Sequence, residues 1–106
     1  MHTIIRTYRV EDGDIDEALH RVDRSFADRL SHEPGFIAYE CFATRPDVIC
    51  SISTFRDKEA GERSNELAAQ FVREELGDMR IAALGTIGGE VQVSRAAREV
   101  LDPAHL

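Results

Sequence analysis

A few polar side chains fall on segments that the sequence predicts to be strands or helices, where they could face a ligand pocket. Glu40 lies within the strand-like run FIAYECFA (36–43). A carboxyl group buried there would have a raised pKa and could act as a general base. Alternatively, Glu40 pairs with Arg6 or Arg9 across the sheet, or reaches solvent at the end of its strand.

Asn65 is the most chemically suggestive residue of the second predicted helix. In a cleft, its uncharged amide could orient a phenol or a developing oxyanion. Alternatively, Ser64 and Asn65 cap or kink the helix, a role that both residue types favour. Tyr8 and Tyr39 lie on predicted strands, where they either point into a cavity or pack as amphipathic core residues.

The histidines show no spacing typical of a metal site, and no cluster with cysteine or carboxylate accompanies them. They stand at positions 2, 20, 32 and 105. His20 follows an apolar position of the first predicted helix and could reach the rim of a cleft. No phosphate-binding glycine loop, nucleophile elbow or dinucleotide fingerprint is present, and GTIGGE (85–90) matches none of these.

The two cysteines are predicted to lie on adjacent strands of one hairpin. If the turn TRPD (44–47) closes an even-numbered loop, Cys41 lies directly opposite Cys50 on the same face. The resulting Cβ separation of about 4.5–5.5 Å is slightly long for a relaxed disulfide. We therefore expect two buried free thiols, with redox switching as the alternative.

Composition excludes several classes of protein. The chain has 106 residues, and 13 Lys+Arg against 20 Asp+Glu give a net charge of −7. This charge argues against binding nucleic acid through its phosphates. No apolar run approaches the ~20 residues of a membrane span, and no signal peptide is evident. With two cysteines and no export signal, a cytoplasmic location is expected.

Hydrophobic periodicity predicts alternating strands and helices. HTIIRTYRV alternates as a strand does, whereas Ile15, Leu19, Val22, Phe26 and Leu30 recur as on a helix face. Gly61 and the Ser64-Asn65 pair could break the second helix, and Gly77 could end it. Gly88-Gly89 suggests a bulge or a close backbone contact in the last strand. The expected elements are a strand at 2–10, a helix at 15–30, strands at 36–43 and 48–55, helical residues within 57–77, a loop at 78–84, a strand at 85–94 and a tail at 96–106.

This order, β-α-β-β-α-β, predicts a ferredoxin-like α+β domain over residues 1–95 with a four-stranded antiparallel sheet. Two helices can cover only one face of such a sheet. The predicted hairpin is partly apolar on both faces, with Tyr39 and Cys41 on one and Phe42 and Ile49 on the other. We therefore expect a homodimer that packs through its sheets.

The chain resembles the antibiotic biosynthesis monooxygenase family of the dimeric α+β barrel superfamily over about residues 3–94. The resemblance rests on EPGFIAYECF after the first helix, on SISTFRDKEAGERSNELAAQFVREEL and on the closing GGEVQVS. It implies a homodimer with a ligand cleft between each sheet and its helices. Haem-degrading members combine a strand-1 Asn, a Trp at the end of strand 3 and a helix-2 His. This chain has Tyr8 and Phe55 at the first two positions and no His within 57–77, which argues against haem.

The resemblance implies a cofactor-independent monooxygenase acting on a small aromatic substrate of the phenol or quinol type, with no cofactor and no metal. The alternative is a non-catalytic dimeric domain that binds a small apolar ligand or modulates another enzyme. Neither alternative involves nucleic acid or a membrane. The candidate catalytic residues are Asn65, Tyr39, Glu40 and His20, and the candidate substrate-binding residues are Tyr8, Phe55, Phe71 and Ser51.

Overall fold

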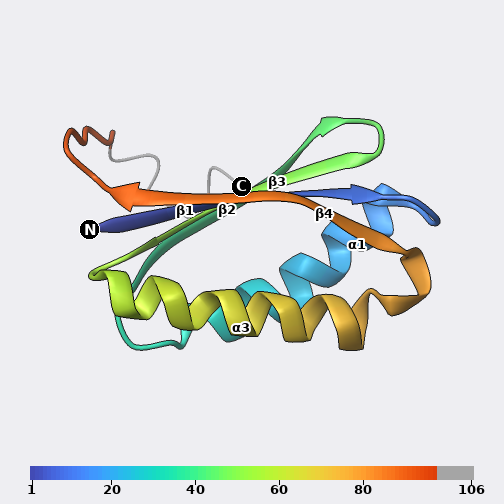
Figure 1. Ribbon diagram of the computed structural model, residues 1–106, viewed down its shortest axis with the longest axis horizontal. Helices are drawn as coiled ribbons and strands as arrows, with labels where there is room; N and C mark the ends of the chain where they lie inside the picture. Colours follow the sequence, from blue (N-terminus) through green and yellow to red (C-terminus); the bar gives the residue numbers. More distant parts are fainter. Residues whose placement is uncertain (98–106) are drawn as a thin grey trace.

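A computed structural model describes residues 1–97, which form one sheet and a layer of helices in the order β-α-β-β-α-β (Figure 1). The first helical stretch consists of two α-helical pieces joined by a π-helical segment, and a short 3-10 turn follows the second helix. The elements are β1 (His2–Val10), α1 (Ile15–Arg21), η1 (Val22–Ala27), α2 (Asp28–Ser31), β2 (Phe36–Arg45), β3 (Val48–Phe55), α3 (Lys58–Glu75), η2 (Gly77–Met79) and β4 (Ile81–Glu90).

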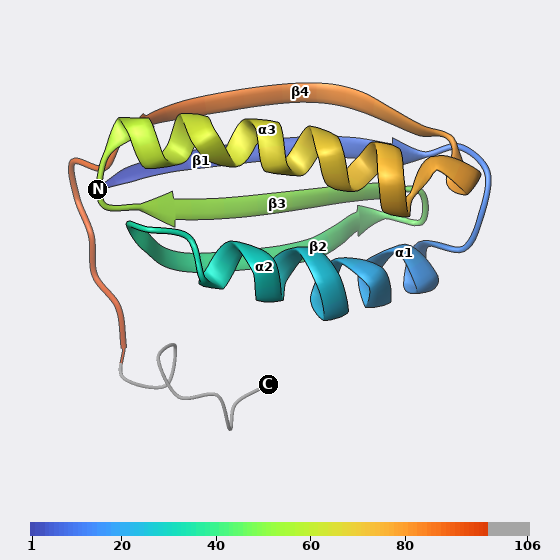
Figure 2. The same cartoon turned by 90° about the horizontal axis from the view of Figure 1, so that it is seen from below.

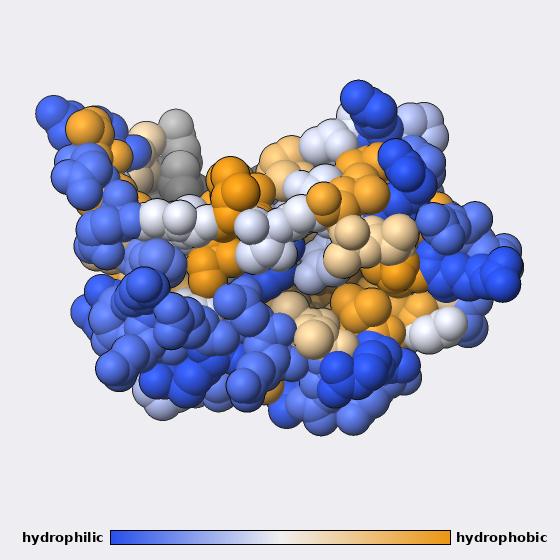
Figure 3. Space-filling model, viewed as in Figure 1, coloured by the Kyte–Doolittle hydropathy of each residue, from blue (hydrophilic) through white to orange (hydrophobic). Residues whose placement is uncertain are grey.

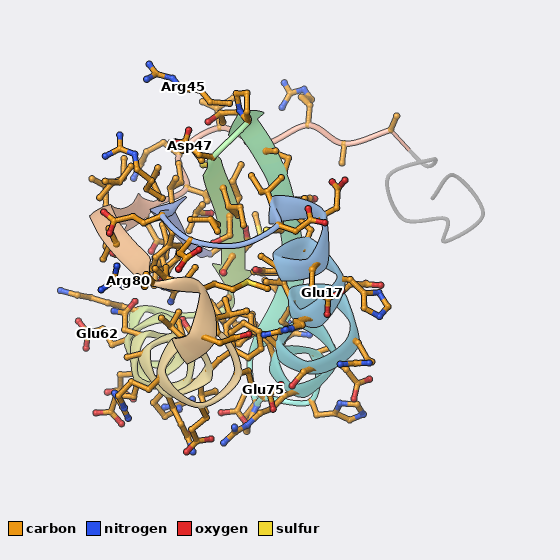
Figure 4. The ribbon with its side chains drawn as sticks, turned by 90° about the vertical axis from the view of Figure 1, so that its right-hand side faces the viewer. Glu17, Arg45, Asp47, Glu62, Glu75 and Arg80 are labelled. Carbon is orange, nitrogen blue, oxygen red and sulfur yellow. The ribbon has the colours of Figure 1, made fainter. Side chains whose placement is uncertain are left out.

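The four strands form a single antiparallel sheet in the order β2-β3-β1-β4. All helices lie against one face of this sheet, and the other face has no covering layer in the described chain (Figures 1 and 4). Seen from the helix side, α3 runs along β1 and β4, whereas the first helical stretch runs along β2 (Figure 2). The predicted ferredoxin-like α+β fold is therefore confirmed.

Short side chains fix where the two helical stretches begin. Asp14 Oδ1 accepts a hydrogen bond from the backbone N–H of Asp16 at 2.9 Å. Asp57 Oδ1 accepts one from the backbone N–H of Ala60 at 2.8 Å. Each carboxylate satisfies a helix-terminal donor that would otherwise lack a partner. Aspartate is among the residue types preferred at this position of a helix.

The first helical stretch was expected to be a regular α-helix, but six of its residues form the π-helical segment η1. Val22, Phe26 and Leu30 are all buried and follow one another at steps of four. A step of four exceeds the 3.6-residue turn of an α-helix, so two successive steps rotate the apolar stripe around a regular helix. The wider turn of a π-helix instead keeps Val22 and Phe26 directed at the sheet.

The second helix is continuous, which corrects the expectation that Gly61 or the Ser64-Asn65 pair would break it. Gly61 is buried where α3 approaches β1. A Cβ atom there would lie 2.9 Å from His2 Cδ2 and 3.0 Å from Ile4 Cδ1. Gly61 therefore allows close packing between helix and sheet. The helix ends at Glu75 with Leu76 as its C-cap, and Gly77 follows the cap, as expected, and begins η2.

The register of the β2–β3 hairpin differs by one residue from the prediction, so the expected pairing of Cys41 with Cys50 is wrong. Cys41 pairs with Ser51, and Cys50 pairs with Phe42. An irregularity between Ala43 and Arg45 accounts for the difference, because an extra residue near the tip shifts every pair below it. The two half-buried free thiols consequently lie on opposite faces of the sheet.

The last strand begins and ends four residues earlier in the chain than predicted. It begins at Ile81 rather than 85 and ends at Glu90 rather than 94. Its register shifts between Ala83 and Gly85, and not at Gly88-Gly89. Gly88 instead lies close to the backbone of β1, because a Cβ atom at this position would be 3.3 Å from the Thr3 carbonyl oxygen. Most of the expected tail, residues 98–106, lies outside the described residues.

The open face of the sheet is concave and carries apolar side chains. Phe42 is 43% exposed, Leu84 is 44% exposed and Ile87 is 68% exposed. The hairpin tip, with Arg45 and Asp47, rises on this side, away from the helices (Figure 4). Figure 3 shows apolar and weakly polar surface in the hollow between the raised ends. Within residues 1–97, no helix is long and apolar enough to cross a membrane.

Candidate functional site

A pocket lies between the sheet and the helices of the chain. Side chains from β1, β2 and β3 form its roof, and η1 and α3 form its floor. We call it the inner pocket, and its cavity volume is about 40 Å³, which is smaller than most ligand pockets in proteins. Its lining is Arg6, Tyr8, Val22, Phe26, Tyr39, Cys41, Ile49, Ser51, Ala68, Phe71, Val72, Leu76 and Ile81.

A second, more open pocket adjoins the inner one between α3 and β4. We call it the outer pocket. Four residues line both pockets, and Arg6 and Tyr8 are the polar ones among them. The complete lining is Arg6, Tyr8, Asn65, Ala69, Val72, Arg73, Ile81, Ala83 and Thr86. The two pockets are therefore neighbours, one in the helix-covered interior and one at the β4 edge.

The Arg6 guanidinium stands at the junction of the two pockets and is only 2% exposed. Its Nη1 donates to Ser53 Oγ at 3.2 Å. Its Nη2 donates to Ser64 Oγ at 2.6 Å and to Asn65 Oδ1 at 2.8 Å. These bonds connect β1 with β3 and α3. All three acceptors are uncharged, so the arginine is held in position without a counter-charge.

Two tyrosine hydroxyls face the same space. Burial raises the pKa of Tyr39 far above its usual range, and the neighbouring Cys41 thiol raises it further. Burial also raises the pKa of Tyr8, an effect that the Arg6 guanidinium partly opposes. Both hydroxyls are therefore protonated at neutral pH and can donate a hydrogen bond to a ligand oxygen.

Aromatic rings hold the far wall of the inner pocket in place. Phe26 packs edge-on against Tyr39, with ring centroids 5.5 Å apart. Phe26 also contacts Phe71, with centroids 5.3 Å apart. Such pairs stabilise beyond the area they bury, so they give this wall a defined shape. A flat aromatic ligand would find complementary apolar surface here.

The structure brings five of the predicted site residues to these pockets. Tyr8, Tyr39, Ser51 and Phe71 line the inner pocket, and Asn65 lines the outer one. The alternative for Asn65, that it kinks the helix, does not hold, because α3 is continuous through it. Its side-chain oxygen instead accepts from Arg6, which leaves the amide N–H groups able to donate elsewhere.

Three predicted residues lie elsewhere. Glu40 pairs with Ile52 on the open face of the sheet and is exposed, because its neighbours Tyr39 and Cys41 face the inner pocket and side chains alternate along a strand. It is therefore not a base in the cleft, and no ion pair joins it to Arg6 or Arg9 in the described chain. His20 is exposed on α1 and lines neither pocket. Phe55 is fully buried against Phe36, so it belongs to the core.

Sequence reasoning missed Arg6 as the organising residue of the site. A signal was present, because Arg6 is the only charged side chain on the strand face that also carries Ile4, Tyr8 and Val10. A charge on a buried face must have polar partners or a ligand. Among residues 1–97, no group of three or more His, Cys, Asp or Glu side chains could hold a metal ion.

The model of the antibiotic biosynthesis monooxygenase family matches residues 1–74, which is more than half of the chain. The chain belongs to this family. No match was found among curated proteins. Solved structures of this fold show the same arrangement at low sequence identity.

Three of these structures match this chain over most of its length. SnoaB, a cofactor-independent oxygenase from Streptomyces nogalater, is 16% identical with a TM-score of 0.67, and the match covers 88% of this chain and 94% of SnoaB. The ActVA-Orf6 monooxygenase of Streptomyces coelicolor, in complex with nanaomycin D, is 12% identical with a TM-score of 0.66 and 91% of both chains covered. A dimeric ferredoxin-like protein from an uncultured marine organism is 14% identical with a TM-score of 0.67, covering 92% of this chain and 100% of the other.

Proposed function

We propose that this family member is a cofactor-independent monooxygenase that acts on a small aromatic substrate of the phenol or quinol type. The observation that carries the proposal is the inner pocket, where aromatic walls enclose protonated hydroxyl donors. Membership of a monooxygenase family and the oxygenase names of two similar structures support it. The substrate ring would lie against the aromatic wall that Phe26 and Phe71 form, with its oxygen toward Tyr8 and Tyr39.

The reaction needs no external reductant when the substrate supplies both electron pairs. Loss of a proton gives an electron-rich carbanion whose charge is shared with the oxygen attached to the ring. The carbanion carbon then forms a bond to O₂. The resulting hydroperoxide loses water and leaves a carbonyl, so anthrone plus O₂ gives anthraquinone plus water. Hydrogen bonds from Tyr39 and the Asn65 amide to the developing oxyanion would lower the barrier.

We further propose that the protein is a cytoplasmic homodimer, associated through the open face of the sheet. Phe42, Leu84 and Ile87 leave apolar surface exposed on this face. Contiguous apolar surface of this kind marks an association site. The similarity to a dimeric ferredoxin-like protein supports this assembly. A cytoplasmic location fits the two free thiols.

Oxygen consumption and anthraquinone formation by purified protein supplied with anthrone would test the enzymatic proposal. We expect turnover above the rate without protein, and a loss of about tenfold or more in Tyr39→Phe and in Asn65→Ala. Glu66→Gln is the matched control, because Glu66 is the exposed neighbour of Asn65 and lines neither pocket. Absence of turnover with both anthrone and a naphthohydroquinone, or equal rates in all variants, would refute it.

One observation favours a second candidate, a non-catalytic domain that binds a small aromatic ligand. No carboxylate or imidazole is among the residues that line the two pockets, so the described chain offers no conventional base there. Binding of aromatic ligands without oxygen consumption would select this candidate.

A further inference from the structure

The charge of the two pockets is opposite to that of the whole protein. The chain carries a net charge of −7. The inner pocket is nevertheless lined by Arg6 and no acidic residue, and the outer pocket by Arg6 and Arg73 and no acidic residue. On α3, Glu62 and Glu75 are exposed and line neither pocket, and Glu75 lies on the side of the helix layer that is away from the sheet (Figure 4). A local excess of positive charge in an acidic protein attracts a negatively charged ligand.

The buried Arg6 guanidinium has hydrogen-bond partners but no negatively charged partner within residues 1–97. Its partners Ser53, Ser64 and Asn65 are neutral, and no ion pair to Arg6 exists within residues 1–97. A guanidinium carries five N–H donors, of which three are used in these bonds, so two remain. Loss of water around the group lowers the pKa of Arg6. An unpaired buried charge destabilises a protein, so its presence at a pocket requires a functional explanation.

We infer that Arg6 is the specificity-determining residue of the site and selects aromatic substrates that carry an anionic group, either a carboxylate or an acidic phenol bound as its phenolate. This inference rests on the proposed function for its assignment of the ligand as a substrate. The remaining guanidinium donors bind the anion at the junction of the pockets. The ring occupies the aromatic inner pocket, and Arg73 attracts the ligand at the outer mouth.

This assignment also provides a counter-charge at the point where the reaction needs one. A phenolate or enolate paired with Arg6 has a lowered pKa, because the adjacent positive charge favours its ionised form. The substrate would therefore enter the reaction already ionised, which explains a pocket without a carboxylate or imidazole base.

Binding of two unreactive probes of the same shape tests the inference. Cinnamate is anionic and cinnamamide is neutral, and isothermal titration calorimetry gives the affinity of each. We expect wild-type protein to bind cinnamate about tenfold more tightly or better, the effect of one charge-assisted hydrogen bond. The preference should disappear in Arg6→Met and partly persist in Arg6→Lys. Arg9→Met is the matched control, because Arg9 lies on the same strand and lines neither pocket.

An NMR measurement on wild-type protein keeps the test decisive if Arg6→Met does not fold. The Arg6 Nε–H resonance should shift when cinnamate is added and not when cinnamamide is added. Equal affinities of wild-type protein for both probes, an unmoved Arg6 resonance, or a full preference in folded Arg6→Met would overturn the inference. Neither probe is oxidised, so the binding preference can be measured even if the protein has no oxygenase activity. Turnover of an aromatic substrate without a preference for the anionic probe would refute the role of Arg6 and leave the proposed function standing.

Discussion

Replacing Ile87 by glutamate should separate the proposed dimer while leaving the protomer folded. Full burial of an isoleucine side chain stabilises by about 1.5–3 kcal/mol. Ile87 is 68% exposed in the protomer, so about 1–2 kcal/mol per copy remains for an interface. A two-fold interface contains each residue twice, which gives about 2–4 kcal/mol, or about 30- to 700-fold in the dissociation constant. An unpaired carboxylate in the interface would weaken association further.

Sedimentation equilibrium over a concentration series measures this effect directly. Wild-type protein should sediment as a dimer at micromolar concentration, and Ile87→Glu should dissociate at concentrations where the wild type does not. Arg24→Gln is the control, since it changes the net charge equally but lies on the exposed side of the helix layer. Far-ultraviolet circular dichroism establishes that both variants are folded. A monomeric wild type, or an Ile87→Glu dimer of unchanged stability, would refute the reasoning.

Three further predictions concern stability and thiol chemistry. Asp57→Ala removes the cap of α3 and should lower the free energy of unfolding by about 1 kcal/mol in urea titrations; an unchanged midpoint would contradict the role of the cap. The Arg21 guanidinium lowers the pKa of the Asp78 carboxyl, so this pair contributes stability above the unfolded-state pKa of Asp78. That contribution is lost as the pH falls through the lowered folded-state pKa, and the stability difference between wild type and Asp78→Asn should shrink accordingly. Because Cys41 and Cys50 lie on opposite faces, mild oxidation followed by unfolding and alkylation should leave two thiols per chain, and an internally bridged chain in the mass spectrum would show that the register is wrong.

The order of elements could be predicted because each segment carries its own periodicity and each helix its own cap. Alternation in HTIIRTYRV and the caps at Asp14 and Asp57 depend only on neighbouring residues. Register depends on how two segments meet. One irregularity near Ala43 was enough to place Cys50 on the face opposite to Cys41, and no local sequence pattern predicts it.

The site was predictable where pocket residues lie on well-defined strands and helices, as Tyr8 and Phe71 do. Arg6 was missed because its importance comes from Ser53 and Ser64, residues far along the chain that only the fold brings to it. The π-helical segment was missed because α and π turns share the same residue preferences, and packing against the sheet selects between them.

The alternation of β1 divides the two proposed roles of the protein, ligand binding and self-association, between neighbouring residues of one strand. Arg6 and Tyr8 face the pockets, whereas Ile5 and Thr7 face the open side of the sheet. Point substitutions can therefore alter ligand preference and self-association independently during evolution. A one-residue insertion or deletion within β1 would exchange the two sets and disable both tasks together. Length variation among descendants of this protein should accordingly accumulate at the hairpin tip near Pro46 and not within the central strands.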